Sequence, residues 1–305
     1  MPLSSYKESL PALTGEEAEI RDRLSEDTKY LSSVIGERNT STVGSLQATR
    51  SYLEERLPAI GYPCIEIPYQ LDGETVSNVE VDLRGNSPMN ETLIVGAHYD
   101  TVHGSPGAND NASGGAALLE LARLLKNSKV EKNVRLVFFV NEEPPFFQTA
   151  SMGSRVYARK LRNDHAAVSA MISLETIGFY SDRPDSQKYP PLLNLFYPSR
   201  GNFIGFVGNS ESRPLAREAI RIFRESVRFP SEGIAAPADW PGIGWSDQWS
   251  FWQEEYPAIM ITDTAPFRYR YYHTRSDTAD KIDFERMARV VVGVERVVKT
   301  LADAH

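Results

Sequence analysis

The stretch TLIVGAHYDTVHGSPGANDNASGG (residues 92–115) joins an apolar strand to a loop that collects imidazole and carboxylate groups. Residues 93–95 are Leu, Ile and Val, and His98, Asp100 and Asp110 follow them. A short run that is apolar on both faces is typical of a parallel strand buried between layers of helices. Ligands bind such sheets at the carboxyl ends of the strands. The stretch therefore predicts a parallel α/β sheet and a functional site that begins at His98.

Two more apolar runs end in acidic residues, as this one ends in His98. RLVFFVNEEPPFF (residues 135–147) leads into Glu142 and Glu143, and AMISLETIGFY (residues 170–180) leads into Glu175. A second histidine, His273, lies in the polar segment before the last helical pattern. Because parallel strands end at one edge of a sheet, we expect these side chains to lie together.

The rest of the chain alternates short apolar runs with helical patterns, which predicts a three-layer α/β/α sandwich with a twisted, mostly parallel mixed sheet. We expect residues 1–305 to form one domain. Thr14 and Glu17 form a capping box that opens a helix to about Ile35, and a second helix covers about residues 43–59. These N-terminal helices, within about residues 14–60, should pack on or near the sandwich. A hairpin is expected around the turn Asp72-Gly73. The run at 203–209 is expected to be a parallel strand.

Composition limits the class of protein. The formal charge is −8, from 41 acidic and 33 basic residues, which opposes binding to nucleic acid or anionic membranes. No stretch approaches the roughly 20 apolar residues of a membrane helix. A lone cysteine, Cys64, excludes an intramolecular disulfide. We expect a soluble protein, cytoplasmic rather than secreted or periplasmic unless a leader was removed, and a monomer rather than an oligomer.

The polar residues at the strand ends favour a metal centre. Several carboxylates in one place repel one another unless a cation offsets their charge. Mixed nitrogen and oxygen ligands suit Zn²⁺, and other divalent transition metals also fit. Two metals sharing a carboxylate and a water would form a hydrolytic centre. The set comprises His98, Asp110, Glu142, Glu143, Glu175 and His273.

The motifs GAHYDT, ANDNASG, NEEPP, SLETIG and YYHTRSDTADKID resemble those of the co-catalytic zinc aminopeptidases of the bacterial leucyl or broad-specificity type. Relatives of that family include glutamate carboxypeptidase and glutaminyl cyclase. The motifs cover roughly residues 92–290 in the family's order. The resemblance implies a metal-dependent exopeptidase that takes peptide substrates with a free N-terminus, with Zn²⁺ as cofactor, two ions per chain or one.

The resemblance also implies a role for each matching residue. His98 and Glu175 would bind the first metal, Glu143 and His273 the second, and Asp110 would bridge them. Glu142 would be the general base, and Tyr272 would stabilise the oxyanion. Asp100 would orient His98 through its other ring nitrogen, and Asp247 would support the site from behind the ligands.

Some residues depart from the family's pattern, and the function and the role of some side chains have alternatives. Glu175 stands where the family usually carries Asp, so it would either bind metal or turn toward the substrate amine. A single-zinc glutaminyl cyclase is the enzymatic alternative, and a non-catalytic binding relative is the other. Gln248 follows Asp247 where many relatives have His. The four tryptophans of residues 239–257 would either pack in the core or form the wall of an apolar pocket.

Overall fold

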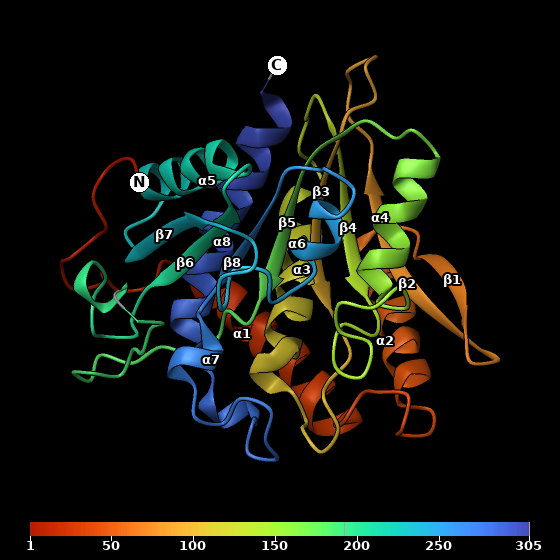
Figure 1. The fold of residues 1–305 in the computed structure, drawn as a ribbon, viewed down its shortest axis with the longest axis horizontal. Helices are drawn as coiled ribbons and strands as arrows, with labels where there is room; N and C mark the ends of the chain where they lie inside the picture. Colours follow the sequence, from red (N-terminus) through yellow and green to blue (C-terminus); the bar gives the residue numbers. More distant parts are fainter. Residues whose placement is uncertain (192, 305) are drawn as a thin grey trace.

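A single eight-stranded sheet organises the protein, as a computed structural model describing residues 1–191 and 193–304 shows (Figure 1). The strand order is β1-β2-β4-β3-β5-β8-β6-β7. In chain order the strands are β1 (Ile65–Leu71), β2 (Glu74–Leu83), β3 (Thr92–His98), β4 (Asn133–Phe139), β5 (Val168–Glu175), β6 (Ile204–Asn209), β7 (Ser231–Ala236) and β8 (Ala258–Thr262).

The sheet is mixed, with a parallel centre. Strands β4, β3, β5 and β8 run parallel to one another. The hairpin β1–β2 forms around Asp72-Gly73 as predicted and pairs antiparallel with β4. The prediction of a parallel strand at 203–209 was wrong in direction, because β6 runs antiparallel to β8. Strand β7, parallel to β6, was not predicted, since its sequence SEGIAA carries no apolar run.

Helices cover both faces of the sheet, which confirms the three-layer α/β/α sandwich. On one face, Leu93 and Val95 of β3 join the core formed with α3, α5 and α8. On the other face, Ile94 packs with Tyr157 of α4 and Phe251 of α6. The helices are α1 (Gly15–Lys29), α2 (Ser45–Ile60), α3 (Ser113–Leu125), α4 (Gly153–Asn163), α5 (Arg213–Ser226), α6 (Gln248–Trp252), α7 (Ala265–Arg268) and α8 (Phe284–Asp303), with short turns η1 (Tyr30–Ile35), η2 (Ala108–Ala112), η3 (Leu193–Leu195) and η4 (Ala279–Lys281).

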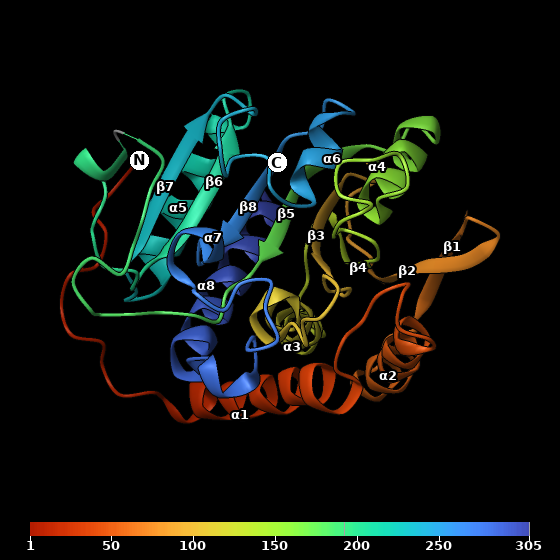
Figure 2. The same cartoon turned by 60° about the horizontal axis from the view of Figure 1, so that its bottom comes forward.

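The N-terminal helices pack around the sandwich and add side chains to its main core. Helix α1 begins at the predicted capping box and packs against α3 and α8 rather than on the sheet (Figure 2). The α-helix ends at Lys29, earlier than expected, and continues as the π-helical turn η1. Helix α2 packs beside α3 and β2. That the whole chain is one domain stays a prediction. Within the described residues, no helix combines the length and the apolar composition needed to cross a membrane.

Arg38 ties this N-terminal segment to the loop that follows β3. Its guanidinium is fully buried and donates hydrogen bonds of 2.8–3.0 Å to five backbone carbonyl oxygens, those of Leu31, Gly36, Tyr99, Pro106 and Gly107. Burial lowers the pKa of Arg38 to about 10, and Asp277, Asp100, Asp110 and Glu143 oppose that shift. The side chain therefore stays a cation that holds the loop between β3 and Asp110.

Replacing Arg38 with Ala is expected to lower the free energy of unfolding by about 3–5 kcal/mol, the cost of breaking a buried charge interaction from one side. The five carbonyl oxygens would lose their donor in a site that water does not reach. Chemical denaturation would measure the change. Arg84→Ala is the matched control, since its side chain is 76% exposed, and it should shift stability by no more than about 0.5 kcal/mol. Equal stability of both variants would contradict the structural role of Arg38.

Candidate metal centre

The predicted site residues meet at the carboxyl ends of three adjacent strands. His98 ends β3, Glu175 ends β5, and Glu142 follows β4 on the opposite side of β3. Asp110 comes from turn η2, directly before α3. His273 lies between α7 and η4. The loop edge of the parallel strands thus brings together groups separated by up to more than half of the sequence.

The first cluster is formed by His98, Asp110 and Glu175, all buried. The Nε2 atom of His98 lies 3.3 Å from Oδ1 of Asp110 and 3.2 Å from Oε2 of Glu175. Ser246 donates a 2.8 Å hydrogen bond to that same Glu175 oxygen. The longer side chain of Glu therefore still reaches the position beside His98.

The second cluster is formed by Asp110, Glu143 and His273. The Nε2 atom of His273 lies 3.1 Å from Oδ2 of Asp110 and 3.2 Å from Oε2 of Glu143. Asp110 belongs to both clusters and turns one carboxylate oxygen toward each imidazole. Its position is that of a ligand shared between two cations.

The inward-facing atoms of these clusters lack hydrogen-bond partners. Among the described residues, Nε2 of His98, Nε2 of His273 and both carboxylate oxygens of Asp110 are buried without one. Buried polar atoms are seldom left unsatisfied. The donor set of imidazole nitrogens and carboxylate oxygens is the one that Zn²⁺ takes. The unsatisfied atoms therefore fit metal ligation.

The shifted pKa values of Glu143 and His273 also fit a site that binds a cation. Burial and the charge of Asp110 together raise the pKa of Glu143 to about 7, against the opposing effect of His273 and His98. Burial lowers the pKa of His273, but the nearby carboxylates of Asp110 and Glu143 outweigh that effect and raise it to about 10. The carboxylates thus favour a positive charge among them, whether a proton on imidazole or a metal ion.

Glu142 lies beside the first cluster without belonging to it. Its Oε2 atom is 3.9 Å from Nε2 of His98. Burial raises the pKa of Glu142 well above its usual value; His98 lowers it, and Glu175, Glu143 and Asp247 raise it. A carboxylate with a raised pKa is suited to accept and return a proton near neutral pH.

Asp100 lies beside His98 and also supports the loop that follows β4. The Nδ1 atom of His98 lies 3.2 Å from the backbone carbonyl oxygen of Asp100 and 3.6 Å from Oδ1 of its carboxylate. The carboxylate also accepts the backbone N–H groups of Glu142 and Glu143, each at 3.1 Å. Asp100 therefore fixes the loop after β4 as well as the ring of His98.

Asp247 and Tyr272 also lie at the site. Asp247 precedes α6, is fully buried, and neither of its carboxylate oxygens has a hydrogen-bond partner among the described residues. Burial raises its pKa to about 7, and His98 opposes the shift. The ring of Tyr272 stacks on that of His273, with centroids 3.8 Å apart. His103, by contrast, is 82% exposed and contacts Glu37.

Asp277 was missed from the sequence. Its carboxylate accepts the backbone N–H groups of Asn109 (2.8 Å) and Asp110 (3.1 Å) and the hydroxyl of Tyr269 (2.7 Å). It thereby holds the backbone of the shared ligand. The only sequence signal is its place in YYHTRSDTADKID, four residues after His273.

Asp277→Asn is expected to weaken zinc binding about 10–100-fold, the usual effect of losing a group that orients a ligand. The amide of Asn has one acceptor oxygen, so one of the two backbone N–H groups would lose its partner. Competition with a chromogenic chelator would measure the affinity. Asp280→Asn, in the same loop but with a 68% exposed side chain, should bind zinc like the wild type. An unchanged affinity in Asp277→Asn would show that the loop needs no such anchor.

Non-glycine residues with positive φ occur around the site. They are Asn141 (φ 58°), Thr176 (φ 49°) and His273 (φ 57°). Asn141 precedes Glu142, and Thr176 follows Glu175. Such conformations are uncommon outside glycine and gather at functional sites, where the surrounding structure enforces them.

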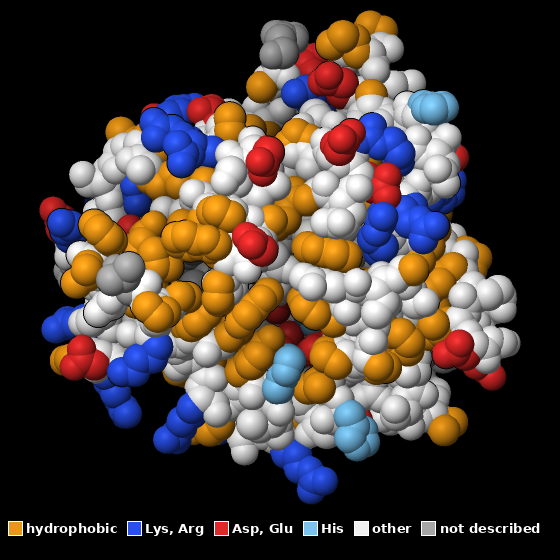
Figure 3. Space-filling view, viewed as in Figure 1, with side chains coloured by type: hydrophobic (Ala, Val, Ile, Leu, Met, Phe, Trp, Pro, Cys, Tyr) orange, Lys and Arg blue, Asp and Glu red, His pale blue; other side chains and the backbone are white. Residues whose placement is uncertain are grey.

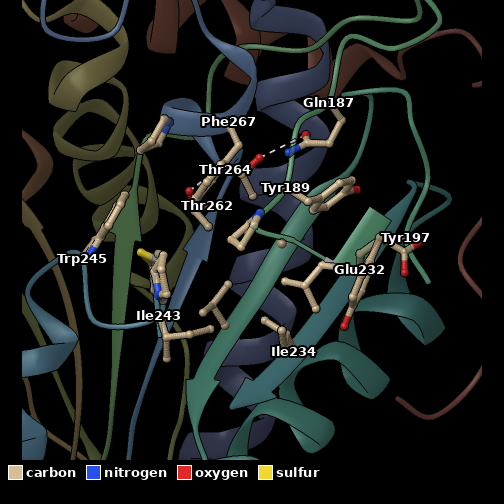
Figure 4. A pocket seen from close by; sticks show the side chains of 18 of the residues that line it. Gln187, Tyr189, Tyr197, Glu232, Ile234, Ile243, Trp245, Thr262, Thr264 and Phe267 are labelled. Atoms are coloured by element: carbon tan, nitrogen blue, oxygen red, sulfur yellow. Dashed lines mark hydrogen bonds between the residues drawn. The ribbon is translucent and has the colours of Figure 1, made fainter. Parts of the chain in front are cut away.

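A pocket opens beside the two clusters (Figure 4), and Glu175 and Tyr272 are among the residues that line it. Tyr189, Tyr197 and Phe267 are among the side chains that line it. Trp245 also lines it and stacks on Phe267, whereas Trp240 is 48% exposed, so the tryptophans play different parts. The space-filling view shows hydrophobic side chains gathered around a hollow with acidic side chains at its bottom (Figure 3).

The sequence matches a known peptidase family over most of its length. A model of peptidase family M28 covers residues 78–298. The chain belongs to this family. It is 37% identical to the uncharacterized protein YfbL of Escherichia coli K12, over 90% of this chain and 86% of YfbL. It is 26% identical to a probable zinc metalloprotease of Pyrenophora teres f. teres, over 71% of this chain but about half (49%) of that protein.

Two solved structures share the fold. BSAP, a zinc aminopeptidase from Bacillus subtilis, superposes with a TM-score of 0.73 at 14% identity, over 93% of this chain and 97% of BSAP. The glutaminyl cyclase of Bacteroides thetaiotaomicron superposes with a TM-score of 0.69 at 20% identity, over 95% and 99%. Membership of family M28 and the zinc metalloprotease relatives support a metal-dependent peptidase, as the resemblance of the motifs implied.

Proposed function

We propose that this protein is a zinc aminopeptidase that hydrolyses the first peptide bond of substrates with a free N-terminus. The observation that carries the proposal is the pair of clusters that share Asp110, with their ligand atoms buried and unpaired. His98, Asp110 and Glu175 would hold one Zn²⁺, and Asp110, Glu143 and His273 the other. Zinc bound in such a site lowers the pKa of water toward neutrality and polarises a carbonyl group.

The protein residues divide the remaining work between them. Glu142 would take a proton from the attacking water and deliver it to the leaving amine, a role for which its raised pKa suits it. The hydroxyl of Tyr272, stacked on His273, would donate a hydrogen bond to the developing oxyanion. The free α-amine of the peptide would pair with Oε1 of Glu175, because Oε2 is the oxygen turned toward His98 and Ser246, and Glu175 also lines the pocket. An anchor for that amine restricts cleavage to the end of a chain.

The direct test combines metal analysis with turnover. Protein dialysed against zinc and then against metal-free buffer should contain about two zinc ions per chain and should hydrolyse aminoacyl-p-nitroanilides. The same substrates with an acetylated amine should not be cleaved. Cleavage of the acetylated substrates would rule out the amine anchor, and a protein without zinc or activity would rule out the centre.

A glutaminyl cyclase is the second candidate, supported by the likeness in fold to a solved cyclase. That reaction releases ammonia from an N-terminal Gln and would go with a single zinc. Two bound ions and no ammonia from Gln-peptides would exclude it.

A further inference from the structure

The register of the sheet places a second carboxylate in line with Glu175, at the far side of the pocket. Glu175 pairs with Thr262, Thr262 with Gly205, and Gly205 with Glu232. Paired residues on neighbouring strands point to the same face of a sheet, and all four residues line the pocket. Three strand spacings separate the two ends of this row, about 14 Å. The pocket therefore has a carboxylate at each end.

Gly205, between Thr262 and Glu232 in this row, adds no side chain to the pocket. A Cβ atom there would lie 3.2 Å from the carbonyl oxygen of Thr262 and 3.5 Å from Cγ2 of Thr264, so the pocket at this point is bounded by the two threonines and narrows with any larger residue at position 205. The walls on either side are largely apolar, with Tyr189, Ile234 and Phe267 among them (Figure 4). Such walls favour methylene groups over polar ones.

Glu232 lines this pocket from β7, and among the described residues its one ion-pair contact is long. Its side chain is 24% exposed, and the nearest guanidinium, that of Arg224, lies 3.9 Å away. The guanidinium of Arg224 donates hydrogen bonds to the carbonyl oxygens of Pro2, Leu3 and Ser231 instead. Burial raises the pKa of Glu232, and Arg224, Ser5, Lys7 and the terminal amine oppose the shift. A cation entering from the pocket would find an acceptor there.

We propose that Glu232 makes the pocket select a first substrate residue that has a long apolar stem and a terminal cation, namely Lys or Arg. The inference rests on the proposed aminopeptidase function and names its substrate class. With the α-amine at Glu175, a lysine side chain extends about 6 Å across Gly205, judged from its bond lengths. The side chains of Glu175 and Glu232 extend toward the substrate from the two ends of the row and span the remaining distance.

The test compares Lys with norleucine, which has the same stem without the charge. The zinc-loaded protein is assayed with both aminoacyl-p-nitroanilides, and calorimetry measures the binding of free L-lysine and L-norleucine, which needs no turnover. The wild type should favour Lys at least 10-fold in kcat/KM, and Glu232→Gln should lower that ratio about 10-fold or more. Glu211→Gln, which removes an exposed charge before α5, should leave the ratio as it is. Thermal unfolding checks that each variant is folded.

A second variant, Gly205→Val, tests whether the substrate side chain passes over Gly205. The branched valine side chain would lie between the two carboxylates and should lower kcat/KM for the Lys and norleucine substrates more than for the Ala substrate.

The outcomes separate the two proposals. If both nitroanilides are cleaved and their ratio does not depend on Glu232, the specificity is overturned and the peptidase function stands. If neither is cleaved but free lysine binds more tightly than norleucine only when Glu232 is present, the pocket assignment stands and the peptidase function falls. Equal binding of the two amino acids without turnover overturns the specificity.

Discussion

Glu142→Gln is expected to lower kcat by about 10²–10⁴-fold, the usual contribution of a general base. The amide keeps the size of the side chain but cannot accept a proton from water. Glu142 does not belong to either ligand cluster, so zinc content should stay near the wild-type value. The measurement is kcat on an aminoacyl-nitroanilide together with zinc per chain.

The matched control for this variant is Glu74→Gln, which removes an exposed carboxylate from the first residue of β2. Its kcat should equal that of the wild type. Full activity in Glu142→Gln would sink the role assigned to Glu142. Loss of zinc together with activity would mean that Glu142 is a ligand instead.

Asp110→Asn should have the other large effect, because one residue serves both clusters. Its two oxygens lie 3.3 Å and 3.1 Å from the two imidazole Nε2 atoms, and an amide can offer an oxygen to only one of them. We expect zinc to fall to one ion or fewer per chain and kcat/KM to fall at least about 10³-fold, since the activated water depends on the ions.

His273→Ala is the comparison that isolates the second cluster. It removes a ligand from that cluster alone, so about one zinc per chain should remain. If Asp110→Asn and His273→Ala both kept two ions, Asp110 would not be the shared ligand. Mass spectrometry of dialysed protein counts the ions in both variants.

The features that could be predicted from the sequence are those with local signals. Short sequence patterns were enough to predict three features: the capping box at Thr14, the hairpin at Asp72-Gly73 and the buried strand β3. The strand-end rule then brought the imidazoles and carboxylates to one edge.

The features that could not be predicted depend on distant partners. Strand β7 has no apolar run because it is an edge strand that lines a pocket with Glu232. The direction of β6 follows from the path of the chain between β5 and β6, which leaves no trace in hydrophobic patterning. Arg38 and Asp277 form hydrogen bonds with backbone groups. Every residue carries such groups, so the sequence of the partner residues does not indicate these contacts.

The buried guanidinium of Arg38 has a consequence for the boundaries of the enzyme. Every proposed ligand lies within residues 78–298, the part that matches the family. Yet the loop that carries His98 toward Asp110 is pinned by a residue 40 positions before that region begins. A chain trimmed to the matched region would keep all its ligands and lose the clamp that spaces them. The smallest unit able to assemble the centre is thus longer than the segment that supplies its chemistry.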